Sequence, residues 1–227
     1  LYAEQQVGFL AGYAAVYEGH RKIAFMGGMA VPAVVRYGQG FIYGADYAAK
    51  ELGLTDVEIQ YHYTGDFEAN QKNQTTAATL YSQGTTIIFA CGGAVGQSVM
   101  AAAANSENNG KVIGVDVDQS AESDTVITSA TKGIGISAYR ALESFFGGDW
   151  EAEVGGKSIT LDAAKDGVGL VMGETARFEH FTKAQYDAIY DKLVKDEIDI
   201  PWDMEKAQNE DQLTVEKVKV YVVGETA

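Results

Sequence analysis

The sequence predicts an α/β protein with an open parallel sheet, and three observations support this prediction. Short apolar runs alternate with longer amphipathic stretches at a spacing typical of βαβ units. The runs are β-branched or aromatic and lack strict polar alternation, as expected for parallel strands covered on both faces. The segment 22–45 reads as a buried strand, a Gly27-Gly28 turn and a helix opened by Pro32. Such a unit places a glycine loop at the carboxyl edge of the sheet, where ligands bind.

The elements of the first half follow in order along the chain. A helix at Glu4–Tyr17 comes before any strand, which is unusual because nothing precedes it to pack against. Helices are then expected at Val34–Leu52, Glu68–Gln83 and Gly96–Asn105. The expected parallel strands are Lys22–Met26, Val57–Tyr63, Thr86–Ala90, Val112–Val115 and, later in the chain, Val168–Met172.

The second half continues the pattern less regularly. A helix at Gly133–Phe146 follows the apolar stretch Val126–Ala130. Thr182 is a suitable N-cap for a helix at Lys183–Lys195. The polar segment Asp203–Gln212 is expected to be a loop, and residues 215–223 alternate with period two, as a half-exposed edge strand does.

Composition limits the classes of partner. The chain has 227 residues, enough for one domain of ordinary size or two small ones. Its 32 acidic and 17 basic residues give a net charge of −15, which argues against nucleic acid or an anionic membrane as a partner. Cys91 is the only cysteine, so an internal disulfide is excluded. Because it has no evident neighbouring base, we interpret it as a small buried hydrophobic residue.

Asp116 is the strongest candidate for ligand contact. It ends the strand KVIGVD, so its carboxylate should project from the carboxyl edge of the sheet, where it can accept hydrogen bonds from a vicinal diol. The alternative is an aspartate that caps the next turn. Asp118 is expected to brace the same loop. Together they resemble the D-x-D of Mg²⁺-dependent phosphohydrolases, although that motif follows the first strand rather than the fourth.

Three further positions are candidates with open alternatives. Phe67 lies in the turn YTGDFEANQ and is either a lid on the core or a platform that stacks on a flat ligand. Gly92 and Gly93 form a strand-to-helix turn whose backbone N–H groups a ligand can approach, without a nucleotide-binding fingerprint. Lys132 ends the stretch VITSATK and is either a solvated surface charge or a residue of the cleft.

Histidine-based chemistry is not supported by the sequence. The three histidines, His20, His62 and His180, are far apart and lack the spacing of metal ligands or of a catalytic triad. We therefore expect no catalytic residues, no metal and no cofactor.

Several separated motifs, in the same order, resemble one known family. They are EQQVGFLAGYAA (4–15), GGMAVPAVVRYGQGF (27–41), YTGDF (63–67), CGGAVG (91–96), IGVDVDQS (113–120), TSATK (128–132) and DGVGL (166–170). In these motifs the chain resembles the basic membrane protein (BMP) family of ABC-transporter substrate-binding lipoproteins, of the purine-nucleoside receptor type. The resemblance covers roughly residues 4–200.

The resemblance implies a fold and a function. The chain would be a flavodoxin-like lobe of a type I periplasmic-binding-protein fold, located outside the cytoplasm on the cell surface or in the periplasm. It would bind a purine nucleoside or a related small polar solute without turnover, for delivery to an ABC permease. Phe67 would stack on the purine, Gly93 would offer its backbone to the ribose, and Asp116 and Lys132 would hydrogen-bond the ribose hydroxyls.

The resemblance also implies a domain organisation. Residues 1–200 would form the second lobe of a two-lobed protein whose first lobe is absent, and the helix at 133–147 would normally cover that first lobe. Its apolar face would then need repacking, another chain or a second copy, and it consists of Ile134, Ile136, Tyr139, Leu142 and Phe146. Residues 201–227 would form a C-terminal extension. The alternatives are a ligand-sensing domain of a regulator, a phosphohydrolase that uses Asp116, and an assembly module.

Overall fold

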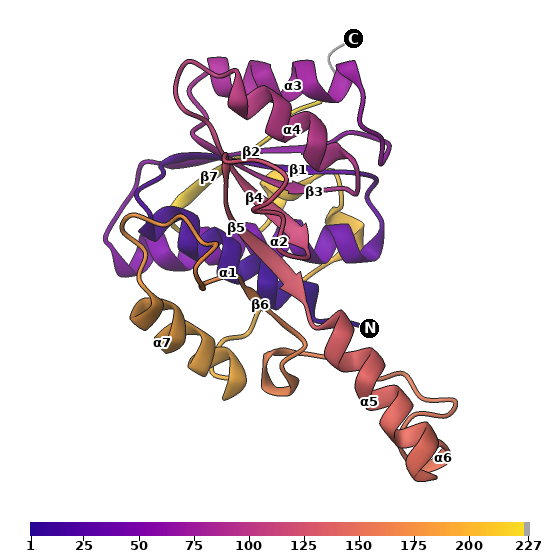
Figure 1. Ribbon diagram of the computed structural model, residues 1–227. Coiled ribbons are helices and arrows are strands. Elements are labelled where there is room, and N and C mark those ends of the chain that lie inside the picture. The colour runs from indigo at the N-terminus through magenta and orange to yellow at the C-terminus, as the bar shows by residue number, and fades with distance from the viewer. Residues whose placement is uncertain (225–227) are drawn as a thin grey trace.

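A seven-stranded, mostly parallel sheet lies between two layers of helices in the computed structural model, which describes residues 1–224 (Figure 1). The predicted α/β class is confirmed. The strand order is β6-β5-β4-β3-β1-β2-β7, and only β6 runs antiparallel to its neighbour. The strands are β1 (Lys22–Gly27), β2 (Val57–Tyr63), β3 (Ile87–Cys91), β4 (Lys111–Asp116), β5 (Val126–Lys132), β6 (Val168–Leu170) and β7 (Val218–Val222).

The helices divide between the two faces of the sheet. Helices α1, α2 and α7 cover one face and α3 and α4 cover the other, and each face has its own cluster of buried apolar residues. Helices α5 and α6 project away from the body (Figure 1). The helix bounds are α1 (Glu4–Tyr17), α2 (Pro32–Glu51), α3 (Gln71–Ser82), α4 (Val95–Ala104), α5 (Ile134–Gly147), α6 (Trp150–Glu153) and α7 (Lys183–Val194).

The chain order reverses between β1 and β3, which are neighbours in the sheet although β2 lies between them in sequence. Open α/β sheets bind ligands at such a switch point, outside the carboxyl ends of the strands. Here the two loops touch, because Gly28 N–H donates to the carbonyl of Cys91 at 3.0 Å. The predicted glycine turn of 22–45 therefore lies at the expected place.

Helices α1 and α2 pack with their backbones in contact. A Cβ atom placed on Gly8 or Gly12 would lie 2.1 or 2.0 Å from a carbonyl oxygen of α2. On α2, a Cβ on Gly40 or Gly44 would lie 2.2 or 1.9 Å from a carbonyl oxygen of α1. Only glycine permits this approach, so four residues spaced by four along two helices fix the distance between them.

Some boundaries and one strand direction differ from the prediction. The segment predicted as a parallel strand at Val168–Met172 is a three-residue antiparallel strand, since the chain returns to the edge of β5 from a long excursion. Helix α3 begins at Gln71 rather than Glu68, because the side chain of Asn70 caps it by accepting from the N–H of Asn73 at 2.9 Å.

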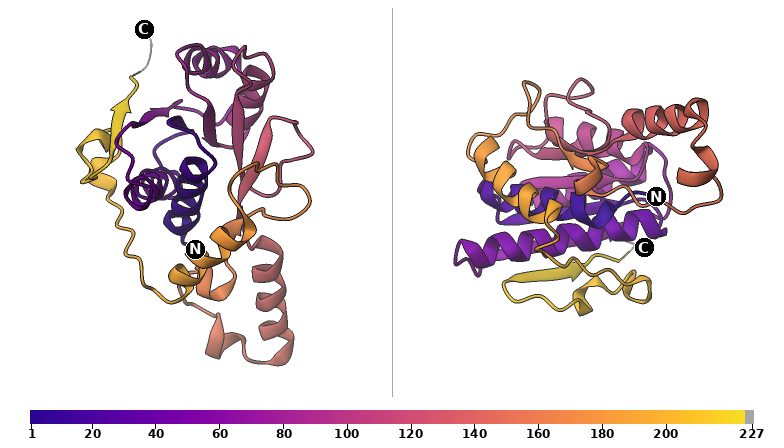
Figure 2. Two further views of the ribbon diagram at one scale, coloured as in Figure 1. Left: turned by 90° about the vertical axis from the view of Figure 1, so that its left-hand side faces the viewer. Right: turned by 90° about the horizontal axis from the view of Figure 1, so that it is seen from below.

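The C-terminal segment runs along α2 to the edge strand β7, which pairs with β2 (Figure 2). The edge strand is confirmed but is shorter than 215–223. The predicted loop contains two short 3₁₀ helices, Met204–Lys206 and Glu210–Gln212. The carboxylate of Asp46 anchors the strand by accepting three successive backbone N–H groups, those of residues 216–218, at 2.6–3.1 Å.

Helix α5 leaves its apolar face in solvent. The side chains of Ile134, Tyr139, Leu142 and Phe146, and of the adjacent Phe145, are 48–81% exposed. Repacking against the described body of the chain, one of the three ways of covering this face that the sequence suggests, does not occur. In the described part of the chain, no helix is both long and apolar enough to cross a membrane.

Candidate ligand site at the carboxyl edge of the sheet

The carboxyl ends of four parallel strands bring the candidate residues to one edge of the sheet. Strand β1 ends at Gly27, β3 at Cys91, β4 at Asp116 and β5 at Lys132. Because these strands are neighbours in parallel register, their ends face the same side of the molecule. Cys91 is buried there, as predicted, and burial raises the pKa of its thiol, as does the nearby Asp116 carboxylate.

Asp116 adopts a left-handed backbone conformation, with φ at 68°, that turns the chain sharply out of β4. Both of its described contacts use one carboxylate oxygen. Oδ1 lies 3.1 Å from Nζ of Lys132 and accepts a hydrogen bond from the Tyr37 hydroxyl at 3.2 Å. The side chain remains 48% exposed. Its carboxylate is thus oriented from one side and open on the other.

Lys132 is held among carboxylates and aromatic rings instead of extending into solvent. Its side chain is only 16% exposed, and its Nζ lies 3.1 Å from Asp116 and 3.5 Å from Glu4. The ring centroids of Tyr2 and Tyr37 lie 5.7 and 5.2 Å from the ammonium, within cation–π range. Burial lowers the pKa of Lys132, but the two carboxylates outweigh it and the pKa lies above its usual value.

Glu4 and Arg36 also belong to this cluster, and the sequence reasoning missed both. Nε of Arg36 lies 2.7 Å from Oε2 of Glu4, and Glu4 is 4% exposed. The available signal is a lone acidic residue at the start of a helix whose buried face is otherwise apolar. It was overlooked because an acid in a first helical turn is common and has an ordinary electrostatic explanation.

Phe67 lies beside the glycine turns of β1 and β3. Its ring covers Gly28, where an added Cβ would lie 2.4 Å from two ring carbons. Its carbonyl accepts from the N–H of Ala94 at 3.1 Å, which ties it to the turn containing Gly93, whose φ is 56°. The ring is half-buried and packs against the core of the α1 and α2 face. It is therefore partly a lid, with one portion left accessible.

The structure brings the four predicted residues together in two pairs. Phe67 contacts the turn at Gly93, and Asp116 contacts Lys132. Phe67 lies in the loop after β2, and Gly93 follows β3. Because β3 is the neighbour of β4, which ends at Asp116, the two pairs lie at adjacent strand ends.

Asp118 has partners separate from those of Asp116. It accepts from the N–H of Ser120 at 3.0 Å and from the hydroxyl of Thr175 at 2.7 Å. These hydrogen bonds lower the pKa of Asp118. Asp118 braces the loop after β4, as predicted. Within residues 1–224, no cluster of three or more acidic, histidine or cysteine side chains has the geometry of a metal site.

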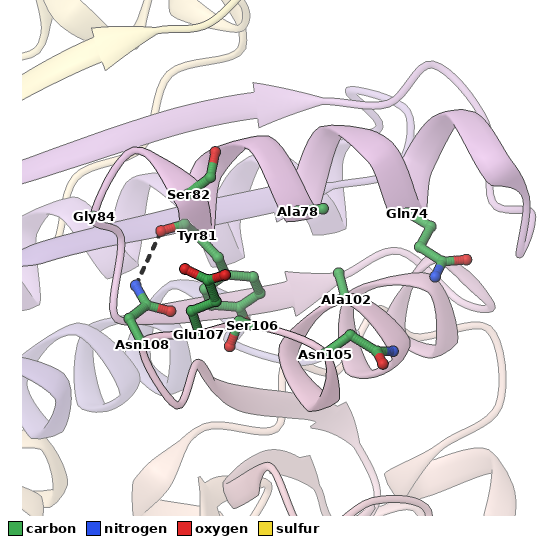
Figure 3. Close-up of a pocket in the computed structure, with 10 residues that line it drawn as sticks. All are labelled: Gln74, Ala78, Tyr81, Ser82, Gly84, Ala102, Asn105, Ser106, Glu107 and Asn108. Carbon is green, nitrogen blue, oxygen red and sulfur yellow. Dashed lines mark hydrogen bonds between the residues drawn. The ribbon is translucent and has the colours of Figure 1, made fainter.

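Two cavities are relevant to the position of the site. One of about 460 Å³ lies between α3 and α4, with Tyr81 at its base and Asn108 donating to the carbonyl of Tyr81 at 2.9 Å (Figure 3). A second, of about 360 Å³, lies beside the candidate site between the β1 loop and the C-terminal segment. Its lining residues are Met29, Ala30, Tyr63, Gly65, Gln208 and Val222–Gly224.

Comparison with known proteins gives the family. The model of the Bmp family, described as PnrA-like ABC transporter substrate-binding proteins, matches residues 1–204. The chain belongs to this family. Basic membrane protein D of Borreliella burgdorferi is 32% identical over 198 residues, which are 86% of this chain and 54% of that protein. A lipoprotein of Pyrococcus furiosus is 29% identical over 178 residues, 74% of this chain and 44% of the relative. The chain thus spans about half the length of these family members.

Solved structures agree with the fold. A solute-binding protein of an Aeropyrum pernix ABC transporter system has a TM-score of 0.70 at 23% identity, over 92% of this chain and 70% of that one. The corresponding protein of Conexibacter woesei gives 0.69 at 24% identity, over 88% and 64%. A LacI-family regulator of Corynebacterium glutamicum is more distant, with a TM-score of 0.54 at 16% identity over 78% and 67%. At these identities the likeness concerns the fold alone. It confirms the predicted α/β fold of the periplasmic-binding-protein type.

Proposed function

We propose that this Bmp-family chain captures a purine nucleoside or a related small polar solute outside the cytoplasm, without chemical turnover, for an ABC uptake transporter. One observation carries the proposal. The carboxylate of Asp116 and the ammonium of Lys132 lie 3.1 Å apart at the switch point edge, with the carboxylate half exposed. A carboxylate beside an ammonium presents acceptors and donors at the spacing of two neighbouring hydroxyl groups, so the pair suits the 2′,3′-diol of a ribose.

The aromatic and backbone groups at the same edge suit a flat base. The half-buried ring of Phe67 is fixed by its contact with Gly28, so its accessible portion is already oriented for stacking. Gly93 offers its backbone two residues before α4, at a helix N-terminus, whose partial positive charge favours polar ligand groups. Stacking supplies affinity that depends little on base identity, while hydrogen bonds to the sugar supply orientation.

Calorimetric titration of the chain with inosine, guanosine, adenosine, ribose and glucose tests the proposal. We expect the nucleosides to bind more tightly than ribose. The substitution Asp116→Asn should weaken the binding of inosine at least tenfold, because it replaces a charged acceptor with a neutral amide. Asp124→Asn is the matched control, since Asp124 is fully exposed. Equal binding of ribose and inosine, or an unchanged affinity in Asp116→Asn, would contradict the proposal.

We further propose that residues 1–200 correspond to the second of two lobes and that α5 packs against the first. The exposed apolar residues of α5, of which Phe146 is 81% exposed, form a face of the kind that packs against protein. The chain's share of about half the length of its relatives is consistent with a further lobe. Native mass spectrometry of the chain, alone and with that missing portion of a full-length relative, tests this. Binding of that portion by the unaltered chain, lost in the double variant Leu142→Ser/Phe146→Ser, supports the proposal. Binding of that portion by the double variant would contradict it.

The family membership, rather than any single side chain, supports the proposed extracytoplasmic location and ABC permease partner. A ligand-sensing domain of a regulator is the second candidate, because LacI-family regulators share the fold. Fold does not decide function, so the two differ only in what the complete protein docks on. Ligand-dependent binding to a permease in membrane vesicles supports transport, and ligand-dependent binding to DNA by the complete protein would support regulation.

A further inference from the structure

A buried carboxylate at the start of α1 contacts two cations at once. Glu4 is 4% exposed, and every other buried residue of α1 is apolar or glycine. A carboxylate loses hydration on burial, and that loss is costly unless its oxygens are paired. Each oxygen of Glu4 faces a different cation: Oε2 lies 2.7 Å from Nε of Arg36, and Oε1 lies 3.5 Å from Nζ of Lys132. Glu4 thus links the ligand-site lysine to α2.

The ammonium of Lys132 is placed between two carboxylates on different elements. Asp116 ends β4 and lies on one side at 3.1 Å, while Glu4 begins α1 and lies at 3.5 Å. An ammonium has three N–H donors, so two can face the carboxylates while the third remains for a ligand. With Asp116 alone, nothing charged would stop the flexible lysine from covering the carboxylate that a ligand needs.

Arg36 makes Glu4 a fixed partner. Its side chain is 13% exposed, and its guanidinium stacks on the ring of Trp202 at 5.0 Å. Two carboxylates and two cations then balance in charge within the cluster. The packing of α1 on α2 sets the distance from Arg36 to Glu4, because the glycine contacts leave the helices no room to slide.

We propose that Glu4 is a positioning residue for the ligand site. It holds the ammonium of Lys132 at a set distance from Asp116, so that the two groups engage neighbouring hydroxyls of one ligand. This inference rests on the proposed function, since it concerns the same site, and it adds Arg36 as the residue that orients Glu4.

The test compares inosine with 2′,3′-dideoxyinosine, which lacks the diol. In the unaltered chain we expect inosine to bind more tightly, and in Glu4→Gln we expect this preference to fall about tenfold, the value of one hydrogen bond to a charged group. If the role of Glu4 were merely structural, Glu4→Gln would weaken the binding of both compounds equally, and the ratio of their affinities would stay unchanged. Glu107→Gln is the control, because Glu107 is exposed beside the cavity between α3 and α4.

A double variant separates position from charge. Glu4→Gln/Arg36→Gln restores the charge balance but removes the fixed partner, so we expect it to behave like Glu4→Gln. Recovery of the preference in the double variant would overturn the inference, as would an unchanged ratio in Glu4→Gln.

A second measurement needs no ligand. The ¹H–¹⁵N signal of the Lys132 ammonium should shift in Glu4→Gln while the backbone amide spectrum stays nearly the same. If the unaltered chain binds no nucleoside, the proposed function fails. The Lys132 ammonium signal then tests by itself whether Glu4 positions Lys132. An unchanged ammonium signal would then overturn the inference, and a local shift would support it.

Discussion

Replacing Gly12 by alanine should destabilise the protein strongly, although it adds only one methyl group. The new Cβ would lie 2.0 Å from the carbonyl oxygen of Phe41, whereas ordinary contacts begin near 3.4 Å. The helices would therefore have to separate by roughly 1.4 Å, the difference between these two distances. Neither partner can yield by rotating a side chain, because the obstructing atom belongs to the backbone of α2.

Forcing one extra methylene into a packed interior usually costs about 1–3 kcal/mol. We expect the upper end of this range, because the same separation also loosens the contacts of Gly8, Gly40 and Gly44. For a chain of this length, a loss of about 3 kcal/mol lowers the Tm by roughly 6–12 °C. Urea titration followed by circular dichroism gives the free energy of unfolding, and calorimetry gives the Tm.

The control is Gly135→Ala on α5. An added Cβ there has no atom within 4 Å, so the substitution should leave stability unchanged or raise it by up to about 1 kcal/mol, because alanine favours a helix. A loss below about 1 kcal/mol in Gly12→Ala, or equal losses in the two variants, would refute the close-packing argument. The same variant should also weaken ligand binding, because α1 carries Glu4 and α2 carries Arg36 and Tyr37.

Three further predictions concern single side chains. Phe67→Ala should weaken inosine binding about tenfold, the value of stacking one base, while Phe67→Tyr should retain it, and equal losses in calorimetry would contradict a stacking role. Asp46→Ala removes the acceptor of three backbone N–H groups, so amide hydrogen exchange at 216–218 should accelerate markedly; unchanged protection would show that β7 needs no anchor. Burial lowers the pKa of His20 from 6.5 to about 4. Between these two pH values the unfolded chain therefore binds a proton that the folded chain does not. Stability should therefore be full above pH 6.5 and fall by roughly 2 kcal/mol by pH 5, and His20→Gln should remove most of that slope in urea titrations.

The sequence predicts the fold class and the edge where the candidate site lies, because both follow from local patterns. Buried strands read as apolar runs, and the last residue of a parallel strand must face the carboxyl edge. Asp116 and Lys132 each end such a run, so their convergence could be expected before any distance was known. The close approach of α1 and α2 could not be predicted from the sequence, because it depends on which faces the two helices turn toward each other.

Contacts between distant elements account for what the sequence does not predict. Glu4 and Arg36 are 32 positions apart and meet only because the glycine contacts bring their helices together. Strand β6 pairs antiparallel with β5 after the long excursion through α5 and α6, and three residues carry too little pattern to show a direction. The anchoring of β7 by Asp46 likewise joins residues about 170 positions apart.

The candidate site is connected through side-chain and backbone contacts to the first residues of the chain and to α5. Residues 1–3 pair with the segment that follows α6, through hydrogen bonds of 2.9 Å between Leu161 and the backbone of Leu1 and Ala3. The hydroxyl of Tyr2 lies 2.6 Å from that of Ser137 in the first turns of α5, and the ring of Tyr2 faces the ammonium of Lys132. Lys132 itself ends β5 directly before α5. A rotation of α5 against the sheet would therefore strain the contacts of Lys132 with Tyr2 and Glu4, so the group proposed to hold the ligand is also the group placed to respond to movement of α5.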